Sequence, residues 1–90
     1  MTQTGTETAE HRLKRLKMRS MRRGIKEMDI LLVRYCDAEL ANLSAADLDT
    51  YDALLWENDQ DLLTWVTGQV PAPDRYAGMI AHIARIPAKG

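Results

Sequence analysis

The stretch KEMDILLVRYCDAEL, residues 26–40, decides the fold class of this chain. Its apolar side chains recur at intervals of three and four, which places them on one face of an α-helix: Met28, Leu31, Leu32, Tyr35 and Cys36. Residues 30–33 are apolar on every side and, taken alone, could form a strand. Because they lie inside a longer helical period, we predict a helix from Lys26 to about Leu40.

Another helix is predicted before this stretch, from about Ala9. Leu13 and Leu16 share a face of this helix, and Met18, Met21 and Ile25 follow at spacings of three and four from one another. Gly24 suits the end of this helix, because glycine adopts a left-handed conformation without a Cβ penalty. Arg23 and Gly24 are therefore predicted to connect two helices, and we call this pair the corner.

Two short helices are predicted after the stretch. Ser44 opens the first, because Ser44 with Asp47 three residues later is close to a capping box. Its buried face consists of Leu48, Tyr51 and Leu55. The next helix begins at Asn58 or Asp59, either of which can cap it. Its inner residues are Leu62 with Trp65 or Val66.

A final helix begins at Pro73, which fits a first turn, and ends before Pro87. Its inner residues follow the helical period: Tyr76, Met79, Ile80 and Ile83. With no convincing strand, the sequence predicts an all-α fold, a compact bundle of five short helices. The single domain should span 9–86, between a disordered tail at 1–8 and a short tail at 87–90.

The charges of this chain are divided along the sequence, although the net charge is only −1. Basic residues concentrate between Arg12 and Lys26, and acidic residues between Glu27 and Asp61. Such a division can steer a partner, and it is equally compatible with a basic segment that folds back on an acidic body.

The expected location is the cytoplasm. The polar start, Met1 to Thr8, resembles neither a secretory signal nor a mitochondrial presequence. The single cysteine, Cys36, cannot form an internal disulfide, which favours a reducing compartment. No apolar run approaches the roughly 20 residues that a membrane-spanning helix needs, so membrane insertion is not expected.

Residues for catalysis are scarce, so we expect no enzyme, no catalytic residue and no metal site. His11 and His82 have no partner at metal-ligand spacing, and Cys36 has no nearby histidine. Asp59 and Asp61 lack the other residues of a calcium loop and suit a helix start. The basic segment carries no DNA-reading motif, so nucleic acid is not an expected partner.

Two segments are more specific than helical periodicity: RRGIKEMD, residues 22–29, and LLWENDQDLLTW, residues 54–65. Together they closely resemble the small FAD assembly factors of succinate dehydrogenase, also called flavinylation factors. In that family an Arg-Gly-x-x-Glu corner is followed by an Asp-x-Asp-Leu-x-x-Trp segment. The resemblance extends from about Arg12 to Ile86 and implies a monomeric five-helix bundle.

The resemblance implies that the chain binds the flavoprotein subunit of succinate dehydrogenase, with fumarate reductase as a further client. Binding would promote covalent attachment of FAD to a histidine of that subunit, while the chain itself binds no FAD tightly. The motif positions imply these partner-binding residues: Arg23, Gly24, Glu27, Asp29, Trp65 and Arg19. An all-α adaptor or antitoxin-like interaction protein, unrelated to flavin, is the alternative.

Each residue of the motif also has a structural interpretation. Gly24 could admit a partner's backbone, with Arg23 and Glu27 binding the partner, or the corner could be a plain helix end with an exposed salt bridge. Trp65 can serve as core or as interface anchor. Trp56 is expected to pack between the third and fourth helices.

Overall fold

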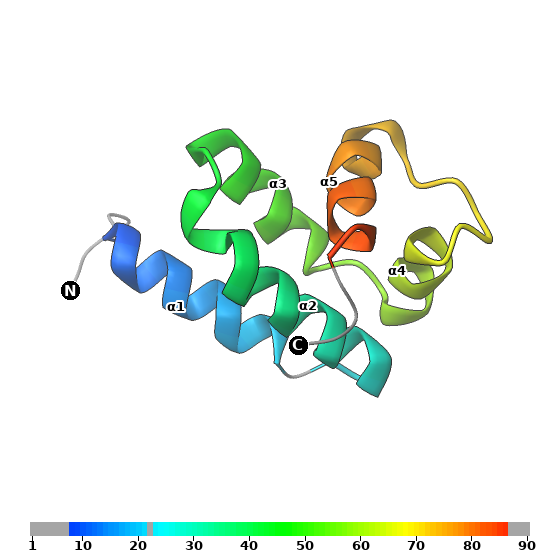
Figure 1. Ribbon diagram of the computed structural model, residues 1–90, viewed down its shortest axis with the longest axis horizontal. Coiled ribbons are helices and arrows are strands. Elements are labelled where there is room, and N and C mark those ends of the chain that lie inside the picture. Colours follow the sequence, from blue (N-terminus) through cyan, green and yellow to red (C-terminus); the bar gives the residue numbers. More distant parts are fainter. Residues whose placement is uncertain (1–7, 22, 87–90) are drawn as a thin grey trace.

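The computed structural model describes residues 8–21 and 23–86, and over these residues it contains five α-helices and no strand (Figure 1). The elements are α1 Ala9–Ser20, α2 Lys26–Glu39, the 3₁₀ turn η1 Leu40–Asn42, α3 Ala45–Leu54, α4 Asp59–Val66 and α5 Asp74–Ala84. The predicted all-α bundle of five short helices is confirmed. The predicted tails fall almost wholly on 1–7 and 87–90, outside the described residues.

Polar side chains begin three of the helices. Thr8 accepts a hydrogen bond from the backbone N–H of His11, and Ser44 accepts one from Asp47, 3.1 Å long. Asn58 accepts one from Gln60 at 2.7 Å. These bonds satisfy backbone donors that have no partner within the helix, so the predicted starts at Ser44 and Asn58 are confirmed.

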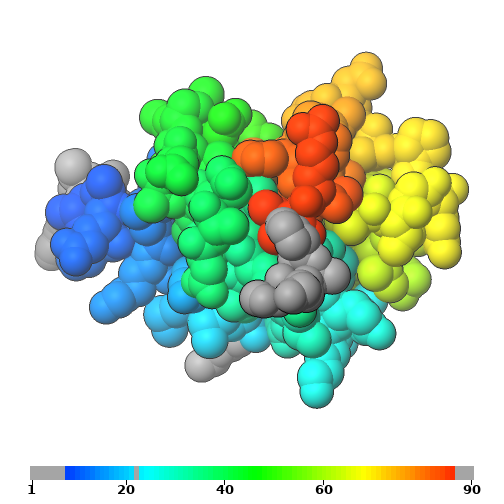
Figure 2. All heavy atoms as spheres, viewed as in Figure 1, coloured from blue at the N-terminus to red at the C-terminus, as the bar shows by residue number. Residues whose placement is uncertain are grey.

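The core is centred on α2, which packs against α1, α4 and α5. Tyr35 of α2 and Tyr51 of α3 are fully buried, with ring centroids 5.5 Å apart. The other core side chains are Leu16, Met28, Leu32, Cys36, Leu40, Leu54, Leu55, Leu62, Tyr76, Met79, Ile80 and Ile83. Figure 2 shows the start of α1 and helix α4 at opposite ends of the molecule.

The apolar residues of the first predicted helix do not all face the core, because Met18 and Met21 are each 52% exposed. The helix turns Leu16 and Ser20 inward instead, and Met18 lies about 200° around the axis from Leu16. The buried Ser20 hydroxyl lies 2.6 Å from the Tyr51 hydroxyl and 2.8 Å from the Leu16 carbonyl. These bonds make a buried serine compatible with the core.

The corner lies where it was predicted, but its geometry differs. Helix α1 ends at Ser20, and Gly24 does not have the left-handed conformation that was expected. Among the described residues, only Gly68 has a positive φ, of 82°, and it lies two residues after the end of α4. Glycine at position 24 therefore needs another explanation, which its surroundings supply.

Candidate functional site

Arg23 is the residue that joins the corner to the distant α3–α4 connection. Its side chain is only 9% exposed. Nε donates to Asp59 Oδ1 at 2.6 Å, Nη1 to the Leu55 carbonyl at 2.7 Å, and Nη2 to the Glu57 carbonyl at 3.0 Å. The planar guanidinium fork suits this set of acceptors, because all three of its nitrogens donate in one plane. Arg23 thus uses its donors inside the protein.

The carboxylate of Asp59 also binds the second residue of the corner. Its Oδ2 accepts a hydrogen bond from the backbone N–H of Gly24. A Cβ atom built at Gly24 would lie 3.0 Å from this oxygen, which is tighter than most packing contacts, so the Asp59 side chain would have to shift to accommodate it. Contact with Asp59 therefore favours glycine at this position, whether or not a partner also uses it.

The other predicted residues of the corner divide between internal and exposed positions. Asp29 accepts a hydrogen bond of 2.6 Å from the backbone N–H of Arg23. Glu27, in the first turn of α2, is exposed, and so is Gly24. No bond joins Glu27 to Arg23 among the described residues, so the carboxylate of Glu27 is available to a partner. A negative charge in this turn also suits the helix dipole.

Arg19 has two neighbours from the acidic half of the chain. Its Nη1 lies 3.2 Å from Asp52, and its guanidinium carbon lies 4.2 Å from the centre of the Trp56 ring. Trp56 itself is 78% exposed, so the prediction that it packs between α3 and α4 is wrong. The preceding pair, Leu54 and Leu55, faces the core, which leaves the next residue on the opposite side.

Trp65 belongs to α4, and its partly buried side chain packs against α5. Its ring packs against Tyr76, with centroids 5.9 Å apart and planes inclined by 32°. The Tyr76 hydroxyl donates to Glu57 at 2.9 Å. The pKa of Tyr76 is raised, mainly by burial and also by this hydrogen bond. The structure therefore supports a packing role for Trp65, and a partner contact stays a prediction.

The basic segment folds back on the acidic body through a row of ion pairs between α1 and α3. Arg12 pairs with Asp49 at 2.5 Å, and Arg15 and Arg19 both pair with Asp52 at 3.2 Å. The Arg23–Asp59 pair continues the row toward α4. Folding back, one of the two alternatives left open by the charge division, is therefore what the structure shows.

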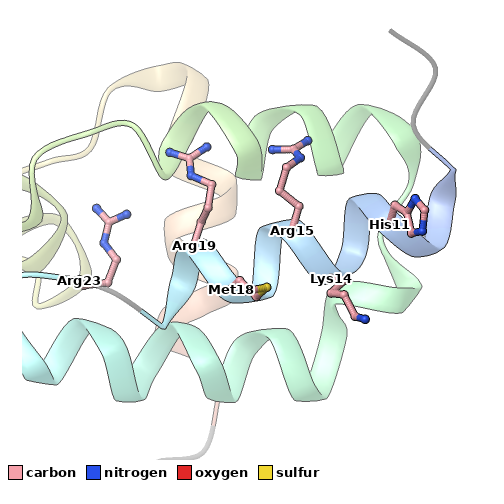
Figure 3. Close-up of a pocket in the computed structure, with 6 residues that line it drawn as sticks. All are labelled: His11, Lys14, Arg15, Met18, Arg19 and Arg23. Carbon is pink, nitrogen blue, oxygen red and sulfur yellow. The ribbon is translucent and has the colours of Figure 1, made fainter. Parts of the chain in front are cut away.

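A groove of about 640 Å³ runs along the outer side of α1 (Figure 3). We call it the α1 groove. In Figure 3 the side chains of Arg15, Arg19 and Arg23 point the same way, toward the neighbouring helices. The lining residues are His11, Lys14, Arg15, Met18, Arg19 and Arg23.

His82 and Cys36 make packing contacts with the two core tyrosines. His82 Nδ1 lies 2.9 Å from the Tyr35 hydroxyl, and the Cys36 sulfur lies 3.3 Å from the Tyr51 hydroxyl. Burial, with a smaller effect of Glu39, raises the pKa of Tyr35 to about 12. Within 8–21 and 23–86, no cluster of three metal-ligating side chains occurs, and no helix has the length and apolarity to cross a membrane.

Comparison with known proteins places these residues in a family. The family described as "Flavinator of succinate dehydrogenase" matches residues 14–87 of this chain. A relative from Meyerozyma guilliermondii is 44% identical over 73 residues, covering 78% of this chain and 54% of the relative. One from Mycosarcoma maydis is 40% identical over 72 residues, covering 80% of this chain and 30% of the relative.

A third relative, from Schizosaccharomyces pombe, is 39% identical over 70 residues, covering 78% of this chain and 50% of the relative. All three are named "Succinate dehydrogenase assembly factor 2, mitochondrial". The chain spans about half the length, or less, of these curated relatives. Their names contradict the predicted cytoplasmic location, because they place the relatives in mitochondria. A free buried thiol such as Cys36 suits any reducing compartment and could not distinguish one from another.

Proposed function

This chain belongs to the family described as flavinator of succinate dehydrogenase, and on that basis we propose that it is an assembly factor. It binds the flavoprotein subunit of succinate dehydrogenase and promotes covalent attachment of FAD to that subunit. We further propose that fumarate reductase is a second client, that the chain works as a monomer, and that it binds no FAD tightly by itself.

The observation that supports this function is the contact between the two family segments. They are separated by about thirty residues in the sequence, yet Asp59 of the second binds both Arg23 and Gly24 of the first. This contact fixes the backbone of the corner while Gly24 and Glu27 stay exposed. A preorganised surface loses less conformational entropy when it binds a partner, which favours a docking role.

The proposed mechanism acts through the conformation of the partner. The bundle binds a state of the flavoprotein in which FAD and the acceptor histidine are held close together in a reactive orientation. Holding reactants in this way lowers the barrier by several kcal/mol, on the order of that measured for intramolecular reactions. The effect requires that the bundle bind this state more tightly than the others.

The first test uses Gly24→Arg, because a side chain at this position would displace Asp59 and cover the exposed corner. We expect covalent flavin on the flavoprotein to fall to the level seen without the chain, measured by in-gel flavin fluorescence in a host that lacks its own assembly factor. Gly78→Arg is the matched control, because Gly78 is exposed on α5 and has open space around its Cβ position. It should leave flavinylation unchanged.

Two results would contradict the proposal. Complete flavinylation without the chain, under limiting and ample FAD alike, would remove the flavin role and favour the all-α adaptor. Affinity purification would then identify a client other than the respiratory flavoprotein. Loss of helical circular dichroism in Gly24→Arg would instead show that the glycine is needed only for folding.

A further inference from the structure

The lining of the α1 groove comes almost entirely from one face of one helix. His11, Lys14, Arg15, Met18 and Arg19 recur at intervals of three and four, which places these residues on the half of α1 that faces away from Leu16 and Ser20. Leu16 and Ser20 occupy the inner side and pack on the core. The groove is therefore a surface that folding of the bundle leaves open (Figure 3).

The charge in the α1 groove is predominantly positive. Arg15 and Arg19 share the single carboxylate of Asp52, and the carboxylate of Asp59 is bound by Arg23. No carboxylate among the described residues pairs with Lys14, which is exposed. Four of the six residues that line the groove are cationic and none is acidic, so the groove is complementary to an acidic segment of a partner.

Apolar surface is exposed at the same place. Met18 in the groove is 52% exposed, and Trp56 is 78% exposed. Arg19 connects them, because it lines the groove beside Met18 and its guanidinium lies over the Trp56 ring. Trp, Met and Arg are the residue types enriched in protein interfaces, and Trp and Arg in their energetic hot spots. A single exposed apolar residue would be ordinary, whereas here two large exposed side chains, Met18 and Trp56, both lie next to Arg19.

The α1 groove is also continuous with the corner. Arg23 lines the groove and, through Asp59, holds Gly24 in place. We propose that the α1 groove and Trp56 extend the docking surface of the corner and bind an acidic segment of the flavoprotein subunit, with an apolar side chain of that segment against Met18 and Trp56. This inference rests on the proposed function, because that function supplies the partner.

The test is calorimetric titration of the FAD-loaded flavoprotein subunit with the full chain and two groove variants. Trp56→Ala should weaken Kd about tenfold or more, as loss of an interface anchor does. Lys14→Glu should weaken Kd about fivefold and reduce the salt dependence of binding, because it reverses one charge of the groove. Both residues are exposed, so both variants should retain the fold.

Matched controls carry the same kinds of change away from the groove. Val70→Ala removes an apolar side chain that is 47% exposed in the α4–α5 connection, and Arg85→Glu reverses an exposed charge directly after α5. Each should stay within about twofold of the wild-type Kd, as distant surface changes do. Incorporated 5-fluorotryptophan, with Trp65→Phe used for assignment, should show the Trp56 resonance shifting when the flavoprotein binds.

The possible outcomes separate this inference from the function on which it rests. If the wild-type chain does not bind the flavoprotein, both fail. If it binds and all four variants bind equally tightly, the groove inference alone is overturned. If Trp56→Ala weakens binding and Lys14→Glu leaves Kd unchanged, the inference that the bound segment is acidic is overturned. The same inference is overturned if the wild-type chain binds nucleic acid and Lys14→Glu abolishes that binding without changing the affinity for the flavoprotein.

Discussion

At the scale of single residues, Arg23 and Gly24 of the corner make contacts that hold the protein's own structure together. The guanidinium of Arg23 is nearly buried and binds one carboxylate and two backbone carbonyls, while Gly24 makes room for that same carboxylate. Removing one partner of a buried ion pair leaves the other charge uncompensated, which is costly. Substitutions in this motif can therefore reduce function by changing the corner itself as well as by removing a partner contact.

Arg23→Lys should lower the free energy of unfolding by about 2–3 kcal/mol, because an ammonium group cannot reach three acceptors in the geometry of the fork. Glu27→Gln is the contrasting variant. Its side chain is exposed, so stability should change by less than about 0.5 kcal/mol while affinity for the flavoprotein falls. Urea denaturation and titration measure the two quantities. Equal stability of Arg23→Lys and wild type would show that the guanidinium contacts contribute nothing to folding.

Gly24 and Asp59 should be energetically coupled. Gly24→Ala brings a methyl group to about 3.0 Å from Asp59 Oδ2 and should destabilise the protein by about 1–2 kcal/mol. In an Asp59→Ala background the same substitution should cost about 1 kcal/mol less, because the obstructing oxygen is gone. A double-mutant cycle from denaturation curves gives the coupling. Additive effects would locate the need for glycine outside this contact.

At the scale of elements, α1 is attached to the bundle in two chemically different ways. Its inner side contributes Leu16 and the hydrogen-bonded Ser20 to the core, and its flank forms ion pairs with Asp49 and Asp52 of α3. Exposed ion pairs contribute little to stability and are screened by salt. The buried contacts should therefore carry most of the attachment.

Ser20→Ala tests that division. It removes a hydroxyl that lies 2.6 Å from the Tyr51 hydroxyl and should cost about 1–2 kcal/mol, because it leaves a buried phenol with fewer partners. Asp49→Asn, which weakens only the exposed pair with Arg12, should cost less than about 0.5 kcal/mol. Thermal unfolding compares the two. A larger effect of Asp49→Asn would mean that the ion pairs dominate.

The helices were largely predictable from the sequence, and the site was only partly so. Periodicity and capping residues located all five helices, because both are local. The caps at Ser44 and Asn58 and the spacing of the buried residues of α2 involve only residues within three or four positions of one another. The orientation of α1 was not predictable, because Met18 and Leu16 are both apolar and only tertiary packing selects Leu16. The bonds from Arg23 to the α3–α4 connection span more than thirty residues, which no local pattern encodes.

At the scale of the whole molecule, the core depends on neutral tyrosines. Burial raises the pKa of Tyr35 to about 12 from an ordinary value of 10.0, and burial also raises the pKa of Tyr51. The folded state therefore retains these protons at a pH where the unfolded chain has lost them. Their contribution to stability is complete below about pH 10 and is lost as pH rises through the folded-state values.

We expect the free energy of unfolding to fall steeply between about pH 10 and about pH 12. Tyr35→Phe should show a shallower fall, because a residue that cannot ionise has no proton to lose. Urea denaturation at several pH values measures both slopes, and tyrosinate absorbance reports the ionisation directly. Parallel slopes for the two proteins would exclude Tyr35 as a source of the alkaline loss.

The contact between Asp59 and the corner also limits how far the recognition element can be reduced in size. A peptide of residues 8–40 would contain every residue of the Arg-Gly-x-x-Glu motif but none of the acceptors of the Arg23 side chain, because these lie in the α3–α4 connection and at the start of α4. The residues of the motif are close together in the sequence, but the surface that they form also depends on residues far from them in the sequence. A miniature mimic or competitive inhibitor based on this chain would need both sequence segments, 22–29 and 54–65, held in the relative positions that they have in the bundle.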